Sequence, residues 1–205
     1  MSIAYLVDDD EAIRDALAWL LRTRGVASRA WGSAEGFLAD YRDDMRGCLV
    51  LDIRMHAMSG SELFDRLLAL GCSLPTIFLT GHGDVPLAVN AIKKGAFDFI
   101  EKPFNDNELA DKVIDALHMD ATRSSLAATA ATIEARLAQL TSREREVMER
   151  VLAGKFNKVI ADELNIAMRT VEVHRSRVFE KMGVRSAVEL ARLLAPLASG
   201  SDQAP

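Results

Sequence analysis

Residues 3–10 read IAYLVDDD, and this stretch predicts the fold of the first half of the chain. The apolar run Ile3–Val7 is too short for a helix and ends in three consecutive acidic residues, so it predicts a buried β-strand. Apolar residues then recur at helical spacing from Glu11 to about Thr23, and Gly25 is expected to end that helix. The same strand–helix unit repeats four more times before residue 120.

The four further units have the same order of one short apolar strand and one amphipathic helix. The predicted strands are 26–31, 48–51, 75–80 and 97–101, and the helices that follow them are 33–41, 59–70, 84–94 and 105–119. Nearly continuous apolar strands that alternate with helices predict a parallel sheet covered on both faces. The carboxyl ends of such strands lie along one edge of the sheet, where functional residues gather.

Acids, one hydroxyl and one amine follow four of these predicted strands. They are Asp8, Asp9, Asp10, Asp52, Thr80 and Lys102. Crowded carboxylates repel one another unless a cation lies among them, and oxygen ligands favour Mg²⁺. A carboxylate can also accept a phosphoryl group, whose charge a lysine would offset. The alternative is that these residues simply accumulate in exposed loops, but their recurrence at four strand ends favours a site.

The segments VDDDEAIR, CLVLDIRM with MSG, PTIFLTGHGD and DFIEKPF together resemble the response-regulator receiver domain, over residues 1–120. The resemblance implies a flavodoxin-like α/β fold, a five-stranded parallel sheet of order 2-1-3-4-5. It also implies that Asp52 is the phosphoacceptor and that Lys102 binds the phosphoryl group. Thr80 and Phe99 match the switch residues, and the Lys102–Pro103 bond is often cis in the family. The implied ligands of Mg²⁺ (or Mn²⁺) are Asp8, acting mainly through water, Asp9, Asp52 and the backbone carbonyl of Arg54.

One position departs from the family pattern close to the phosphoacceptor. Relatives usually carry Met-Pro there, whereas this chain reads Met55-His56-Ala57-Met58. Losing a proline frees φ and restores a backbone donor, so we expect a looser loop and an altered phosphoryl lifetime or donor preference. His56 has two interpretations, a residue that takes part in the chemistry and an exposed loop histidine, of which the second is favoured.

Residues 121–140 are rich in alanine and contain neither Gly nor Pro, so they predict a helical linker. Leu126, Ile133 and Leu140 recur every seven residues, but two heptads are too few to establish a coiled coil. Two alternatives remain open. The linker is either a short coiled coil of a dimer that continues the last receiver helix, or a solvated helix packed on its own domain.

Residues 141–198 predict an all-α module of four helices, followed by a disordered tail at 199–205. Thr141 or Ser142 can cap the first helix and Gly154 ends it, and the other helices are 157–164, 169–182 and 186–194. Two short helices joined by a tight turn, the second rich in bases, are typical of a helix-turn-helix, whose second helix lies in the major groove.

The segment from LTSREREVM through NKVIADELNI to RTVEVHRSRVFEKMGV resembles the LuxR/FixJ-type DNA-binding domain. The resemblance implies that Glu172, Val173 and Ser176 face base edges, where Glu172 can accept from cytosine and Val173 can contact thymine. For His174, packing within the domain and phosphate contact remain equally open. The phosphate-contact candidates, which position rather than specify, are Lys158, Arg169, Thr170, Arg175, Arg177 and Lys181.

The charge of the 205-residue chain changes sign between its parts. The net charge is −5 overall, −8 over residues 1–120 and +3 over residues 121–205, which indicates two domains with different partners. No apolar run is long enough to cross a bilayer and the start lacks a signal-peptide pattern, so we expect a cytoplasmic protein. Cys48 and Cys72 are expected as buried thiols.

The order of the two domains resembles a FixJ-type two-component response regulator, which is not an enzyme. The implied partners are a sensor histidine kinase, promoter DNA, a second copy of the chain on phosphorylation and, for an activator, RNA polymerase. One rival is a phosphorylation-independent DNA-binding regulator with a divergent receiver. Another is a Mg²⁺-dependent aspartyl-phosphate phosphotransferase, against which the absence of an Asp-x-Asp repeat at Asp52 argues.

Overall fold

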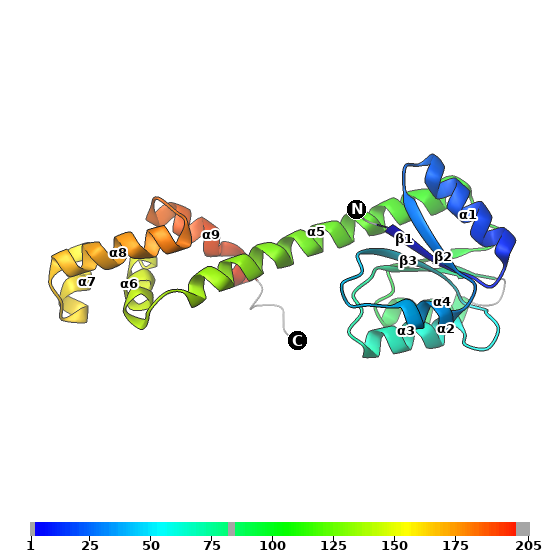
Figure 1. Cartoon of the computed structure of the whole chain (residues 1–205), viewed down its shortest axis with the longest axis horizontal. Coiled ribbons are helices and arrows are strands. Elements are labelled where there is room, and N and C mark those ends of the chain that lie inside the picture. Colours follow the sequence, from blue (N-terminus) through cyan, green and yellow to red (C-terminus); the bar gives the residue numbers. More distant parts are fainter. Residues whose placement is uncertain (1–2, 82–84, 200–205) are drawn as a thin grey trace. The chain divides into compact units, whose positions relative to one another are not determined.

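The apolar run at the start of the chain forms the strand β1 (Ile3–Val7), which lies between β2 and β3 in a five-stranded sheet (Figure 1). The other strands are β2 (Ala27–Trp31), β3 (Gly47–Asp52), β4 (Thr76–Thr80) and β5 (Asp98–Glu101). All neighbouring strands are parallel, and their order is β2-β1-β3-β4-β5, which confirms the predicted flavodoxin-like sheet. The computed structural model describes residues 3–81 and 85–199.

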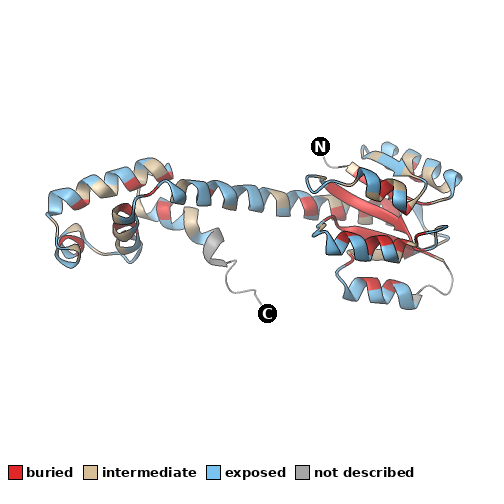
Figure 2. Cartoon of the chain, turned by 60° about the horizontal axis from the view of Figure 1, so that its bottom comes forward, coloured by how far each residue is buried: buried red, intermediate tan, exposed pale blue. Residues whose placement is uncertain are grey.

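Helices cover both faces of this sheet. On one face α1 (Glu11–Thr23) and α5 (Asp106–Ala138) pack against one set of strand side chains. On the other face α2 (Ala34–Asp40), α3 (Gly60–Ala69) and α4 (Val85–Lys93) pack against the alternate set. Because successive strand residues point to opposite faces, the central strands are buried throughout, as Figure 2 shows in red.

The turn from β3 into α3 requires glycine at position 60. A Cβ at Gly60 would lie 2.0 Å from the carbonyl oxygen of Asp52, so a larger residue would displace the end of β3. Ser59 and Glu62 form a reciprocal capping box that starts α3 directly after this turn. The seven-residue loop between Asp52 and Gly60 is therefore held at both of its ends.

The helix α5 extends through the predicted linker. The helices predicted at 105–119 and 121–140 are one helix, Asp106–Ala138. The chain divides into two units, Met1–Ser124 and Ser125–Pro205, so α5 contributes residues to both. Two of the three predicted coiled-coil positions, Ile133 and Leu140, are buried in the core of the second unit, and Leu126 is 60% exposed.

Residues 142–199 of the second unit form four further helices around one core. They are α6 (Ser142–Leu152), α7 (Asn157–Leu164), α8 (Met168–Met182) and α9 (Ala187–Ser199). Asn165 adopts a left-handed conformation with φ 52° and ends α7, which makes the tight turn into α8. The helix α9 runs five residues beyond its predicted end at 194, so the first residue of the predicted disordered tail is helical. Residues 200–205 lie outside the described residues.

Among residues 3–81 and 85–199, no helix is both long and apolar enough to cross a membrane. Cys48 and Cys72 are free thiols, Cys48 buried as expected and Cys72 only half-buried. Burial raises the pKa of the Cys48 thiol to about 12, so that side chain stays neutral in the core.

Candidate functional site

Three carboxylates meet at the carboxyl end of the sheet. Asp8 and Asp9 directly follow β1, and Asp52 is the last residue of the neighbouring strand β3. One oxygen of each lies within 4.8 Å of the others, and Asp8 and Asp52 are 1% and 6% exposed. Asp10 has a different role, because it is the N-cap of α1. Its side chain accepts hydrogen bonds from the backbone N–H groups of Ala12 and Ile13 in the first turn.

Lys102, just after β5, provides the cation that pairs with these acids. Its Nζ donates to Asp8 Oδ2 at 2.8 Å and to Asp52 Oδ1 at 2.7 Å. Burial raises the pKa of Asp52, and the Lys102 ammonium offsets part of that effect. Burial also disfavours a charged Lys102, but its two carboxylate partners raise its pKa overall. The Lys102–Pro103 bond is cis, as the resemblance implies.

The two predicted switch residues lie on β4 and β5. Thr80 is fully buried at the end of β4, and its hydroxyl donates to the carbonyl of Ile100 at 3.3 Å. Phe99 is half-buried and packs against the core under α2, α3 and α4. Arg54 is exposed after β3, and the metal contact of its carbonyl stays a prediction. The structure thus brings Asp8, Asp9, Asp52 and Lys102 together and places the switch pair on the adjoining strands.

The loop after β3 makes a contact that the sequence interpretation missed. The backbone N–H of His56 donates to Asp9 Oδ2 at 2.9 Å, and the ring Nδ1 contacts the same oxygen. The His56 side chain is 98% exposed, as the favoured interpretation expected, yet it also touches the acidic group. The hydrogen bond from the His56 N–H holds the pKa of Asp9 below its usual range. The replacement of the family's proline was the available signal, since proline has no N–H to donate.

The second unit presents the predicted DNA-contacting residues mainly on α8. Val173, Ser176 and Arg177 are exposed, Glu172 and Arg175 are half-exposed, and Val171 and Val178 on the opposite side are buried. Arg169 forms an ion pair with Glu172 at 3.3 Å. Lys158 and Thr170 are exposed as well. His174 is half-buried, and its Nδ1 has no hydrogen-bond partner among the described residues.

The carboxyl end of α8 is fastened to its own unit. Lys181 donates to the buried Glu144 at 2.6 Å and to the carbonyl of Gln139 at 3.1 Å. Arg136, near the end of α5, donates to the carbonyl of Met182 at 2.8 Å. A phosphate contact by Lys181 stays a prediction, and it would compete with these internal partners.

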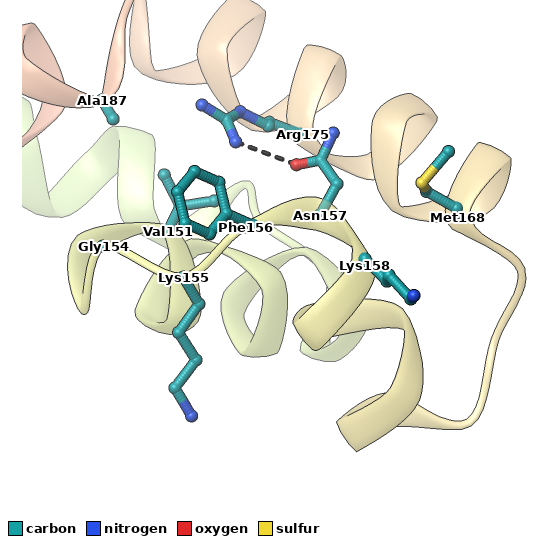
Figure 3. A pocket seen from close by; sticks show the side chains of 9 residues that line it. All are labelled: Val151, Gly154, Lys155, Phe156, Asn157, Lys158, Met168, Arg175 and Ala187. Atoms are coloured by element: carbon teal, nitrogen blue, oxygen red, sulfur yellow. Dashed lines mark hydrogen bonds between the residues drawn. The ribbon is translucent and has the colours of Figure 1, made fainter.

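A surface pocket of about 530 Å³ lies between the start of α7 and the side of α8. Figure 3 shows Arg175 reaching from α8 to Asn157 at the start of α7, with a hydrogen bond of 2.9 Å. Phe156, which precedes α7, is 81% exposed. Lys158 points outward on the other side of Asn157, toward the Met168 side of the pocket (Figure 3). Arg175 therefore already holds α7 and α8 together through its guanidinium.

The helices of this unit differ in how their first turns are capped. Thr141 and Glu144 form a capping box at α6. Phe156 and Ala167, the N-cap residues of α7 and α8, make no side-chain cap hydrogen bond in this part of the chain, and neither side chain offers an acceptor. The first N–H groups of α7 and α8 are consequently suited to an anion such as a backbone phosphate.

Comparisons with known proteins agree with this geometry. Residues 4–114 match the response regulator receiver domain, and residues 138–194 match the bacterial regulatory proteins of the luxR family. The C4-dicarboxylate transport transcriptional regulatory protein DctR of Rhodobacter capsulatus is 50% identical over 92% of this chain and 97% of its own length. The chain belongs to the response regulators whose receiver domain is followed by a luxR-family domain.

Two further relatives support this membership. The transcriptional regulatory protein FixJ of Bradyrhizobium diazoefficiens is 44% identical to this regulator over 92% of each chain. A low-resolution structure of the response regulator StyR matches it with a TM-score of 0.87 and 40% identity over 95% of this chain and 98% of that chain.

This regulator is therefore a two-component, DNA-binding transcriptional regulator and not a catalytic enzyme, which removes the phosphotransferase alternative. Its three carboxylates form the acidic group typical of the Mg²⁺ site in receiver domains.

Proposed function

We propose that phosphoryl transfer to Asp52 from a cognate histidine kinase switches this regulator between two DNA affinities. The observation that carries the proposal is the Lys102 ammonium, which bridges Asp8 and Asp52 at 2.8 and 2.7 Å. An Asp52 oxygen attacks the phosphorus of the kinase phosphohistidine, the P–N bond breaks, and the imidazole nitrogen retains the electron pair. Lys102 then offsets the charge of the phosphoryl oxygens.

The residues suited to hold Mg²⁺ (or Mn²⁺) are Asp8, Asp9, Asp52 and the carbonyl of Arg54. Their oxygen donors and the close approach of the carboxylates fit a hard divalent cation. When bound, the ion supplies positive charge against the transferring phosphoryl group. The single positive charge of Lys102 does not neutralise three carboxylates. The remaining negative charge favours the binding of a further cation in the acidic group.

The switch follows from Thr80 and Phe99. The Thr80 hydroxyl exchanges its hydrogen bond to the Ile100 carbonyl for one to a phosphoryl oxygen, and the half-buried Phe99 turns inward. Phosphorylation in this way selects a conformation already accessible to the chain. Exposed apolar residues on α4 support a homodimer of the phosphorylated form through α4 and β5. They are Leu87, Val89 and Ile92, which are 45%, 42% and 38% exposed.

The dimer binds a two-fold promoter site through α8. Glu172, Val173 and Ser176 read base edges, and the phosphate contacts come from Lys158, Arg169, Thr170, Arg175, Arg177 and Lys181. The uncapped first turns of α7 and α8 support these backbone contacts. We further propose that the regulator is a cytoplasmic activator that contacts RNA polymerase from the promoter, in keeping with the transcriptional regulatory proteins to which it is similar.

The test compares DNA affinity with and without beryllofluoride and Mg²⁺, a stable substitute for the phosphoryl group. Wild type is expected to bind promoter fragments, first located by footprinting, at least tenfold more tightly with the substitute, and Asp52→Asn is expected to show no change. Asp15→Asn, an exposed carboxylate outside the acidic group, serves as the matched control and should respond like wild type.

Equal affinities for wild type in both conditions would overturn the phosphoswitch. They would instead favour the phosphorylation-independent regulator with a divergent receiver. A tenfold response that persists in Asp52→Asn would place the switching group elsewhere in the receiver.

A further inference from the structure

His56 contacts the outer member of the acidic group with both its backbone and its ring. The N–H and Nδ1 both meet Asp9 Oδ2, and the same Asp9 lies with Asp8 and Asp52 in the group of three carboxylates. Of those three, Asp9 is the most exposed, with 24% of its side chain accessible. An imidazole is therefore placed at the open side of a cation site, where the proline usual in relatives would offer no ligand atom.

The backbone around His56 fixes this placement. The Met58 N–H donates to Glu35 of α2 at 3.0 Å, and the Gly60 N–H donates to the Ile53 carbonyl at 3.0 Å. Between these points Ala57 adopts φ 62°, a left-handed conformation that costs free energy for a residue with a Cβ. The surrounding bonds hold the loop in this strained form, and that form directs His56 toward Asp9.

The contact with Asp9 places the His56 ring beside a candidate ligand atom. Neighbouring ligands of an octahedral ion with bonds of about 2.1 Å lie about 3 Å apart. Nδ1 lies closer to Asp9 Oδ2 than this spacing, so a small rotation of the side chain brings it to the position of an adjacent ligand. The ring contacts Asp9 alone of the three acids, and its 98% exposure leaves it room to turn toward the others.

A site of three carboxylates and one imidazole nitrogen prefers different metal ions from a site of three carboxylates alone. Carboxylate and carbonyl oxygens suit Mg²⁺, whereas imidazole suits later first-row ions, whose affinity for nitrogen rises along the Irving–Williams order. In the contact with Asp9, Nδ1 is the donor and bears the ring proton. As a ligand Nδ1 offers its lone pair, and the proton resides on Nε2 instead.

We propose that His56 is an additional metal ligand, through Nδ1, that shifts the preference of the receiver site from Mg²⁺ toward imidazole-binding divalent ions such as Co²⁺. The proposal rests on the proposed function, because it takes Asp8, Asp9 and Asp52 as the cation site. In this proposal the residue at position 56 helps to determine which metal the site prefers, an effect that proline could not have.

The test measures Mg²⁺ and Co²⁺ binding to the full chain by equilibrium dialysis, for wild type, His56→Gln, His118→Gln and Asp52→Asn. Glutamine at 56 keeps the backbone N–H to Asp9 and removes the imidazole, and His118 is an exposed histidine outside the acidic group. Wild type and His118→Gln should prefer Co²⁺ over Mg²⁺ about tenfold more strongly than His56→Gln does. Contact-shifted imidazole protons in the NMR spectrum of the Co²⁺-loaded chain should disappear only in His56→Gln.

The possible outcomes distinguish the role of His56 from the existence of the cation site. An unchanged Co²⁺/Mg²⁺ ratio, or shifted protons that survive in His56→Gln, would overturn the role of His56 while leaving the cation site intact. A parallel loss of affinity for both ions in His56→Gln would show that the ring only orients Asp9. Failure of wild type to bind either ion, or undiminished binding by Asp52→Asn, would refute the proposed cation site itself.

Discussion

Glu144 shows how a single residue joins two helices of the DNA-binding unit. Its side chain is 2% exposed and accepts from the Lys181 ammonium and from the Thr141 N–H, which lie at the end of α8 and the start of α6. The Lys181 hydrogen bond, opposed by burial, holds the pKa of Glu144 below its ordinary value of 4.5. A buried charge with these partners stabilises the unit only while it remains ionised.

We predict that Glu144→Gln lowers the free energy of unfolding of residues 125–205 by about 2 kcal/mol at neutral pH. Because the folded pKa is depressed, the contribution of Glu144 is complete above pH 4.5 and is lost as the pH falls through the folded pKa. The difference between wild type and Glu144→Gln should therefore shrink on acidification.

The measurement is urea unfolding of the fragment 125–205, followed by far-UV circular dichroism because both tryptophans, Trp19 and Trp31, lie outside it. Glu180→Gln, an exposed glutamate on the same helix as Lys181, should differ from wild type by less than about 0.5 kcal/mol. A Glu144→Gln difference that grows at low pH would contradict the assigned sign.

At the same scale, the sequence predicts some site residues better than others. Asp52 and Lys102 could be predicted because parallel topology alone brings the ends of β3 and β5 to one edge. The contact between His56 and Asp9 could not, since it depends on a left-handed Ala57, a conformation that alanine rarely adopts. The competing partners of Lys181 also escaped prediction, because Glu144 is 37 residues away in the chain.

At the scale of elements, α8 has two sides with different tasks. Its buried side packs through Val171, Val178 and Met182, and its exposed side carries Val173, Ser176 and Arg177. Periodicity could predict this division, and the bounds of α7 as well, because both depend on local spacing. The absence of glycine and proline from 121–140 also predicts a helical linker, and its continuity with the last receiver helix is one of the two alternatives. Periodicity could not predict that the end of α5 packs in the core of the second unit, because tertiary contacts decide where its residues pack.

The two kinds of residue on the exposed side of α8 should respond differently to substitution. Arg177→Gln is expected to weaken binding to all DNA sequences and to reduce the slope of log K against log salt by about 0.9 for each DNA phosphate that is no longer neutralised. Glu172→Ala should instead change the ranking of promoter variants, by about 1–3 kcal/mol at the base pair it faces. Both are measured by fluorescence anisotropy over a salt series.

Arg192→Gln removes the same charge from α9, where the side chain is exposed, and is the matched control for Arg177. It should leave the salt slope near that of wild type. A change in base preference caused by Arg177→Gln, or a uniform loss of affinity in Glu172→Ala, would reverse the assignment of these two residues.

At the scale of the whole molecule, the net charge of −5 is the sum of an acidic and a basic part that have different functions. The acidic residues of the receiver include three that converge at one edge of the sheet, while four bases of the second unit lie on α8 alone. Composition could therefore predict two partners for the chain but not the limits of the parts. Ile133 and Leu140 are buried in the core of the second unit, which spans Ser125–Pro205, so residues before 141 pack with the helices that follow them.

The second unit should consequently depend on the end of α5 for its stability. Ile133 is 1% exposed and Leu140 5% exposed in its core, and burying each contributes about 1.5–3 kcal/mol. Arg136 adds the hydrogen bond to the Met182 carbonyl at the end of α8. We predict that a fragment of residues 141–205 is less stable than one of residues 125–205 by about 3–6 kcal/mol, enough to leave it largely unfolded at 37 °C.

Thermal unfolding of the two fragments by circular dichroism measures this difference, and two substitutions in the longer fragment identify its source. Ile133→Ala should cost about 2–4 kcal/mol, whereas Leu126→Ala, at a position 60% exposed, should cost less than about 0.5 kcal/mol. Equal stability of the two fragments would mean that the module is complete from 141 and that the end of α5 only rests on it. A large cost for Leu126→Ala would instead indicate a helix–helix interface between two chains, because the exposed Leu126 side chain has few packing partners within a single chain.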